Sequence, residues 1–179
     1  MPSVDANYRY IAAYQEVNAR ITQRQQALAL YVSCTLGLLA VVVALRPQAN
    51  GAAAWLALGF PVAAGCFALL NHKSEQAISH LRRFLCELER LDDAHLQLPS
   101  YNSDPRWAEG SNAARRFHDL AAAALVAGGN LAGLGAVLVL HRPNQGQAWV
   151  PLVAATLLAL LALFGVLMTG RRRFSAPAA

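Results

Sequence analysis

Four long apolar blocks, none of which contains a charged residue, constrain what this sequence can fold into. The blocks comprise residues 27–45, 52–70, 120–140 and 148–169. Each is close to the length of about 20 residues with which a helix crosses about 30 Å of hydrocarbon. Because a bilayer offers no water to backbone N–H and C=O groups, uncharged runs of this length form helices. We therefore predict an all-α integral membrane protein with four transmembrane helices rather than a soluble bundle, whose helices would keep a polar face.

The basic residues predict the orientation of these helices. The chain has 15 Lys and Arg residues, and all but Arg46 and Arg142 fall before the first block, between the second and third, or after the fourth. The positive-inside rule then places both termini and the central segment in the cytoplasm. Trp55 and Trp149 lie near the starts of the second and fourth helices, where aromatic residues anchor helices at the outer interface. The net charge of +5 describes an inner-leaflet surface, so no direct binding of nucleic acid is expected.

These features divide the chain into five segments. We predict a cytoplasmic amphipathic helix over residues 1–26 and a first transmembrane hairpin over residues 27–70. A cytoplasmic helical segment with a loop follows over residues 71–117, then a second transmembrane hairpin over residues 118–170 and a basic cytoplasmic tail over residues 171–179. The second transmembrane helix is expected to continue to about Leu98, where Pro99 stops it. A loop then extends to Ser111, near which a helix restarts.

Apolar stripes mark both cytoplasmic helices. In the first helix, large apolar residues recur at helical spacing, while Arg24 and other polar residues are assigned to the remaining faces. These apolar residues are Tyr10, Tyr14, Val17, Ile21 and Leu28. In the second helix, a stripe predicted to pair helices in the cytoplasm is surrounded by charged residues that include Glu75. Its members are Ile78, Leu81, Leu85 and Leu88.

The two outer turns resemble each other. Arg46-Pro47 and Arg142-Pro143 are each followed by a glycine and then by Trp55 or Trp149. A tandem hairpin repeat would explain this, and its two hairpins would be related by an axis along the membrane normal. The alternative is that short outer turns converge on Pro, Gly and an interfacial Trp without duplication.

The third block contains small residues around one amide. Gly129 and Gly133 form a small-xxx-small pair, which lets two helix backbones approach closely in lipid. Asn130 needs hydrogen-bond partners, because an unpaired amide in hydrocarbon is costly. We predict that Gly129, Asn130 and Gly133 form an oligomer interface or line a pore, and the alternative is packing within one protomer. In the second block, Pro61 is expected to kink the helix.

Residues that could carry chemistry are scarce. No Asp, Glu, Lys, Arg or His lies within the four blocks, whereas ion-coupled transporters usually need such residues. His72 and His118 both lie at the inner interface, where they would meet if the second and third transmembrane helices packed together. Their surroundings predict neither a metal site nor a catalytic role. We therefore predict no enzyme activity and no cofactor.

One family resemblance rests on layout. A helix with Tyr8-Arg9-Tyr10, Asn18-Ala19-Arg20 and Gln25 leads directly into a hairpin, and a long helix from Asn71 to Leu98 follows. This layout resembles the small bacterial SLATT-type effectors, which implies a pore-forming effector of a nucleotide-signalling antiphage system. The second hairpin departs from the usual two-span pattern. In size and layout the chain is also similar to the four-span membrane subunit of the Kiwa phage-defence system, which implies a soluble cytoplasmic DNA-binding partner.

The sequence thus favours a homo-oligomer, with a tetramer preferred, in the inner membrane of a bacterium. The leading hypothesis is a pore or effector of a defence or stress system that is gated through its cytoplasmic helices. The alternative is a non-conducting membrane sensor or scaffold that recruits and restrains a soluble cytoplasmic partner. A transporter or membrane enzyme is disfavoured by the lack of ionisable residues in the blocks.

Overall fold

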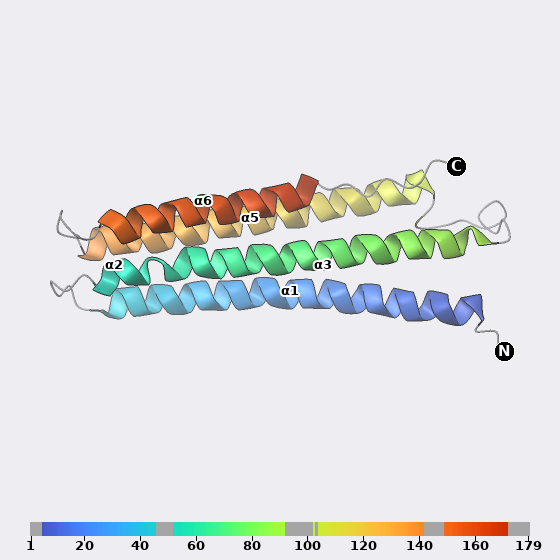
Figure 1. Cartoon of the computed structure of the whole chain (residues 1–179), viewed down its shortest axis with the longest axis horizontal. Helices are drawn as coiled ribbons and strands as arrows, with labels where there is room; N and C mark the ends of the chain where they lie inside the picture. The colour runs from blue at the N-terminus through green and yellow to red at the C-terminus, as the bar shows by residue number, and fades with distance from the viewer. Residues whose placement is uncertain (1–4, 46–51, 92–101, 103, 142–148, 172–179) are drawn as a thin grey trace.

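The computed structural model describes residues 5–45, 52–91, 102, 104–141 and 149–171, and within these ranges it contains helices and no strand (Figure 1). In chain order the helices are α1 (Ala6–Ala44), α2 (Ala52–Leu56), α3 (Gly59–Glu89), α5 (Pro105–His141) and α6 (Trp149–Arg171). Four helical stretches are long and apolar enough to cross a membrane. The predicted all-α class is therefore confirmed.

The helices differ in length. Helix α1 has 39 residues and runs without a break, in keeping with the absence of Gly and Pro between Ala6 and Leu36. Its first turn is capped by Asp5, whose side chain accepts a hydrogen bond of 3.1 Å from the backbone N–H of Asn7. Helix α6 has only 23 residues. At about 1.5 Å per residue, α1 is about 58 Å long and α6 about 35 Å.

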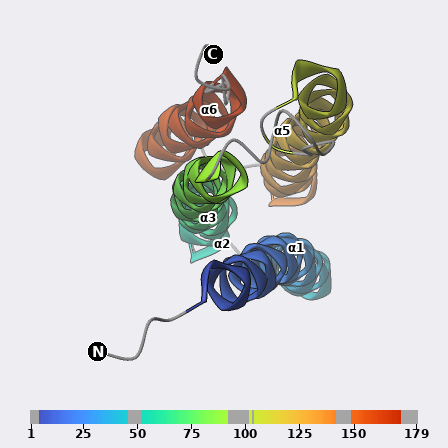
Figure 2. The same cartoon turned by 90° about the vertical axis from the view of Figure 1, so that its right-hand side faces the viewer.

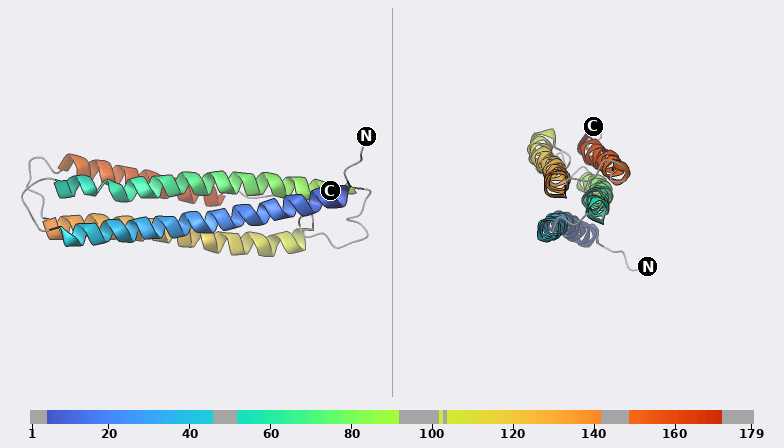
Figure 3. Two further views of the ribbon diagram at one scale, coloured as in Figure 1. Left: turned by 90° about the horizontal axis from the view of Figure 1, so that it is seen from below. Right: turned by 90° about the vertical axis from the view of Figure 1, so that its left-hand side faces the viewer.

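The four long helices lie side by side along one axis (Figure 1). At one end of the bundle, here called the turn end, α1 and α5 end and α2 and α6 begin. Helix α1 begins at the opposite end, here called the open end. Helix α6 stops partway, so α1, α3 and α5 continue toward the open end without it. Figure 3 shows the same arrangement from two further sides.

The order of helices around the bundle argues against the expected symmetry axis. Helix α1 packs against α3 and α5, and α6 packs against the same two helices. Seen end-on, α1 and α6 lie on opposite sides of α3 (Figure 2). An axis along the bundle would place the equivalent helices α1 and α5 diagonally, but they are parallel neighbours. The two hairpins are thus displaced sideways from each other, and the predicted two-fold relation is wrong.

A short interruption separates α2 from α3 at Ala57 and Leu58. Pro61 follows in the first turn of α3. A proline ring clashes with the carbonyl four residues earlier, here that of Ala57, and supplies no N–H to it. The sequence predicts a kink at Pro61, and the structure has an interruption just ahead of the proline.

Two predicted helix ends on the open-end side are wrong. Helix α3 ends at Glu89, well before Leu98, and the two acids that follow, Asp92 and Asp93, are unfavourable at the negative end of a helix dipole. Helix α5 starts at Pro105 instead of near Ser111. Proline suits a first helical position, and Asp104 accepts a hydrogen bond of 3.0 Å from the backbone N–H of Arg106.

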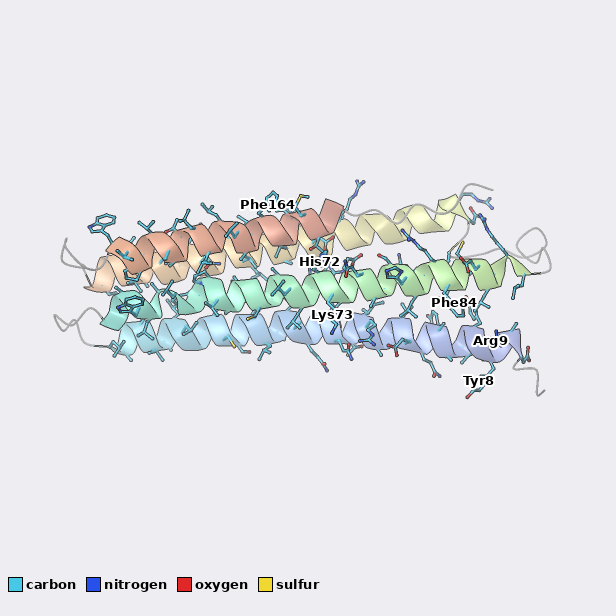
Figure 4. All side chains as sticks on the ribbon, viewed as in Figure 1. Tyr8, Arg9, His72, Lys73, Phe84 and Phe164 are labelled. Atoms are coloured by element: carbon cyan, nitrogen blue, oxygen red, sulfur yellow. The ribbon has the colours of Figure 1, made fainter. Side chains whose placement is uncertain are left out.

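Apolar side chains fill the bundle and also cover its outside. One core cluster takes a residue from each long helix, including Tyr31, Phe67, Val126 and Val166. The rings of Tyr31 and Phe67 are stacked with centroids 5.3 Å apart. On the outside, large apolar residues such as Leu131 and Phe164 are exposed, and Phe164 projects away from α6 in Figure 4. Along the four apolar stretches, as far as the structure describes them, the outer surface therefore lacks the polar face of a soluble helical bundle.

Candidate functional site

One buried arginine joins three of the long helices. Arg24 of α1 donates from Nε to Asn71 Oδ1 at 2.7 Å and from Nη1 to Glu75 Oε2 at 3.2 Å, both on α3. Its Nη2 donates to Oδ1 of Asp119 on α5. We call Arg24, Asn71, Glu75 and Asp119 the Arg24 cluster. One guanidinium therefore holds α1, α3 and α5 at a single level.

The Arg24 cluster is buried and brings two carboxylates to one guanidinium. Arg24 is 7% exposed and Glu75 is 3% exposed. Burial lowers the pKa of the Arg24 guanidinium, and the neighbouring Asp119 carboxylate opposes that shift. Two carboxylates from different helices share this one cation. A buried charge without its partner is strongly unfavourable, so Arg24 keeps α3 and α5 together by neutralising an acid on each.

The Arg24 cluster lies at one defined height along the bundle. Arg24 stands 20 residues before Ala44, the last residue of α1. Glu75 stands 20 residues after Trp55, and Asp119 stands 22 residues before the end of α5 at His141. At 1.5 Å per residue, each distance is about 30 Å, the hydrocarbon thickness of a bilayer. The cluster and the turn end thus bracket an apolar slab of that thickness.

Helix α6 ends at the same height. The Nδ1 atom of His72 on α3 lies 3.3 Å from Oγ1 of Thr169, near the end of α6. Figure 4 shows His72 beside the end of α6. His118, next to Asp119 on α5, has a buried Nε2 without a hydrogen-bond partner among the described residues. The meeting of the two histidines at the inner interface stays a prediction.

Beyond the Arg24 cluster, α1, α3 and α5 continue as a three-helix extension. Leu85 of α3 packs against Ala13 and Val17 of α1, with Leu81 and Tyr10 beside them. The stripe predicted to pair helices is used here within one chain. Its other two members, Ile78 and Leu88, are buried and half-buried.

The end of the extension is tied by polar contacts to Glu89. Tyr10 donates its hydroxyl to Glu89 Oε1 at 3.2 Å, and Asn102 donates from Nδ2 to the same oxygen at 2.7 Å. Burial, with help from the Glu89 carboxylate, raises the pKa of Tyr10, so the phenol keeps the proton that it donates. These contacts join α1, the end of α3 and the segment ahead of α5.

The glycines predicted to form an oligomer interface or pore lie inside the bundle. A Cβ at Gly133 would come within 2.4 Å of the Phe60 ring, and one at Gly129 within 2.7 Å of the Tyr31 hydroxyl. Asn130 is 4% exposed and donates to the carbonyl of Val126 on its own helix at 2.8 Å. An oligomer interface or pore through these residues would require their present contacts to open.

The two tryptophans predicted as interfacial anchors are exposed near the turn end. Trp55 belongs to α2 and Trp149 begins α6, and their exposed fractions are 62% and 58%. Both rings are therefore free to lie at one polar–apolar boundary, while the Arg24 cluster marks the opposite boundary.

The Arg24 cluster is the feature that the sequence analysis missed. Arg24 and Glu75 were assigned to polar faces, and both assignments are wrong. In α1 the buried residues Val17, Arg24 and Tyr31 recur every seven positions, whereas Tyr14 and Ile21 are exposed. The spacing of seven residues can be seen in the sequence. The prediction missed Arg24 because it assumed that only apolar residues occupy the buried face.

No protein family, no curated protein and no solved structure matches the chain. The SLATT-type and Kiwa-type resemblances stay predictions from layout.

Proposed function

We propose that the chain is a four-span membrane effector of a bacterial defence or stress response. In this proposal both termini and the three-helix extension lie in the cytoplasm, and several copies assemble in the inner membrane. The extension receives a signal, and the Arg24 cluster transmits it to the apolar part of the bundle. The SLATT-type layout is the reason for proposing defence as the setting.

Three properties support insertion in a membrane. The outer surface of the apolar slab is itself apolar, which suits contact with lipid tails. The slab has about the thickness of the hydrocarbon layer, with exposed Trp55 and Trp149 near one boundary. The basic residues are concentrated on the side of the Arg24 cluster, which corresponds to the cytoplasm.

The observation that carries the effector proposal is the burial of one cation between acids of two helices. Moving any one of α1, α3 and α5 relative to the others separates Arg24 from Asn71 and Glu75 or from Asp119. Separating a buried pair costs about 3–5 kcal/mol unless water or another partner replaces it. In this proposal a ligand or partner that stabilises the separated arrangement by that amount shifts the population toward it.

The described arrangement corresponds to a shut state. Asn130 and Thr35 each donate to a carbonyl of their own helix, at 2.8 Å and 2.9 Å. Their hydrogen-bond capacity is therefore partly used inside one chain. A water path would have to form when the extension rearranges, by exposing groups that are now internal.

Membrane potential tests this proposal directly. We expect cells that express Arg24→Gln to depolarise without a trigger, as measured with a voltage-sensitive dye, because two acids then lose their shared cation. Arg20→Gln is the matched control, since Arg20 is on the same helix but pairs with Glu16 at the surface. Equal dye signals from both variants, with both proteins present in the membrane, would argue against gating through the Arg24 cluster.

A reversible disulfide between α3 and α6 tests whether gating requires these two helices to move against each other. A Cβ built at Gly165 on α6 lies 3.7 Å from the Cβ of Ala68 on α3, within the range of about 3.5–4.5 Å found in disulfides. With the native cysteines replaced, oxidised Gly165→Cys with Ala68→Cys should abolish triggered depolarisation, and reduction should restore it, if gating moves α6 against α3. If gating instead breaks the Arg24 cluster, oxidation should leave the depolarisation unchanged. The single variants are the controls.

The second candidate is a non-conducting scaffold that holds a soluble partner on the extension. It is favoured by the internal position of Asn130, which leaves few polar groups to line a path between chains. A scaffold predicts that Arg24→Gln changes co-purification of the partner and never the membrane potential. Dye signals that stay flat during triggered growth arrest would select this candidate.

A further inference from the structure

Helix α1 carries a second apolar row that its own bundle does not cover. Ile11, Tyr14 and Ile21 are 52%, 53% and 38% exposed, although all three lie on the extension, beyond the apolar slab. Asn18 lies between them and is also exposed. The row lies beside the buried face of α1, which includes Tyr10, Ala13 and Val17. Large apolar side chains in a line on a polar extension mark a contact surface.

The row has the spacing and composition of a coiled-coil seam. Ile11, Tyr14, Asn18 and Ile21 follow the steps of three and four residues that alternate between a and d positions. Asn18 then occupies an a position. A single asparagine there favours parallel pairing in one register, because two copies of the same amide can donate to and accept from each other.

The charges around the row suit a second copy of the same helix. Tyr8, Gln15 and Thr22 flank the seam on its outer side and are uncharged; Tyr8 projects away from the bundle in Figure 4. Glu16 and Arg20, away from the seam, neutralise each other at 2.6 Å. Two identical rows can therefore meet without repulsion, and the row offers no charge to attract an acidic or basic partner.

We propose that Ile11, Tyr14, Asn18 and Ile21 form a seam with the same four residues of a second chain, parallel and in register. The parallel orientation rests on the proposed function, since copies inserted in one membrane share one orientation and one depth. The seam is shorter than the heptad repeats of stable free coiled coils. Confinement of both chains in the bilayer raises their effective concentration and so offsets that weakness.

Disulfide cross-linking in membranes tests the seam. In a background with Cys34, Cys66 and Cys86 replaced by alanine, a single cysteine is introduced at Ile11, Asn18, Ala12 or Gln23. All four positions are exposed, so the fold tolerates the change. Because disulfides need Cα atoms within about 7 Å, we expect Ile11→Cys and Asn18→Cys to form dimers at least about tenfold faster than the two controls.

A seam-breaking variant provides the second arm. Tyr14→Glu with Ile21→Glu places four like charges in the seam of two copies, so cross-linking through Asn18→Cys should fall at least about tenfold. Gln23→Glu, off the seam, should leave it unchanged. Rates that are equal on and off the seam, or a cross-link to a different protein only, would overturn the pairing.

The outcome also separates this inference from the proposed function. If the protein is in the membrane fraction and depolarises cells on triggering, but no seam position cross-links, the pairing is refuted and the effector proposal stands. If the protein is not in the membrane fraction, both are refuted.

Discussion

Replacing Arg24 by glutamine should be far more damaging than the same change at Arg20. Arg24 is buried and donates to a polar or acidic group through each of its three nitrogens, whereas Arg20 and its partner Glu16 have side chains that are 38% and 44% exposed. Removing one member of a buried ionic group costs about 3–5 kcal/mol. An exposed pair between neighbouring turns contributes about 0.3–0.5 kcal/mol.

Thermal unfolding in a mild detergent, followed by far-UV circular dichroism, measures this difference. For a chain of this size, 1 kcal/mol corresponds to about 2–4 °C in Tm. We expect Arg24→Gln to lower Tm by at least about 6 °C and Arg20→Gln by no more than about 2 °C. Asp119→Asn should fall between them, because it leaves Arg24 and Glu75 as a balanced pair.

A triple variant separates lost packing from unpaired charge. Arg24→Gln, Glu75→Gln and Asp119→Asn together remove every charge of the cluster, and the two amides that replace the acids keep the volumes of those acids. Since replacing a whole buried ionic group is often close to neutral, the triple variant should recover most of the Tm lost in Arg24→Gln. A triple variant as unstable as Arg24→Gln, or an Arg24→Gln Tm equal to that of Arg20→Gln, would refute the charge argument.

Three further predictions address the packing and the topology. Gly133→Ala should destabilise the chain by about 1–3 kcal/mol because the new Cβ would clash with Phe60, whereas Gly128→Ala, where nothing lies within 4 Å, should be neutral or stabilising; Tm in detergent compares them. Leu85→Ala should cost about 2–5 kcal/mol by opening a cavity against α1, while the adjacent, exposed Phe84→Ala should not, and equal losses would contradict the packing of the extension. In a cysteine-free background, a membrane-impermeant thiol reagent should label Asn50→Cys and Gln145→Cys from outside but not Ser103→Cys or Ser175→Cys; outside labelling of Ser103→Cys would contradict the four-span topology.

Much of the fold could be predicted because the apolar blocks leave few alternatives. An uncharged run near 20 residues specifies its own helix, since every backbone hydrogen bond is made within the run. The long α1 could be predicted because Gly and Pro are missing from its interior. The end of α3 depends in part on distant contacts, because Glu89 is held by Tyr10 and Asn102, which come from other parts of the chain. The start of α5 has local signals, Pro105 and the Asp104 cap, which the prediction overlooked.

The Arg24 cluster could not be predicted because its partners are distant in the sequence. Asn71 and Asp119 lie 47 and 95 residues from Arg24, and only the packed bundle brings them together. The apolar periodicity of α1 also gave a wrong prediction of its buried face, because this helix has two apolar rows. Tyr14 and Ile21 belong to the exposed row, Tyr10 and Val17 to the buried one, and the sequence merges them into one stripe.

The distribution of polar contacts indicates which helix has the freedom to move. Arg24 links α1, α3 and α5 but not α6, whose described polar contact with another helix is the one between Thr169 and His72. Apolar packing in hydrocarbon is tolerant of small displacements, because lipid tails can replace the lost contacts. A rearrangement of the extension that keeps the Arg24 cluster intact would therefore carry α1, α3 and α5 together and leave α6 to slide or tilt against them. If the cluster breaks instead, α1 moves relative to α3, to α5 or to both. The Gly165–Ala68 disulfide blocks the first of these motions and leaves the second free, so it distinguishes the two routes.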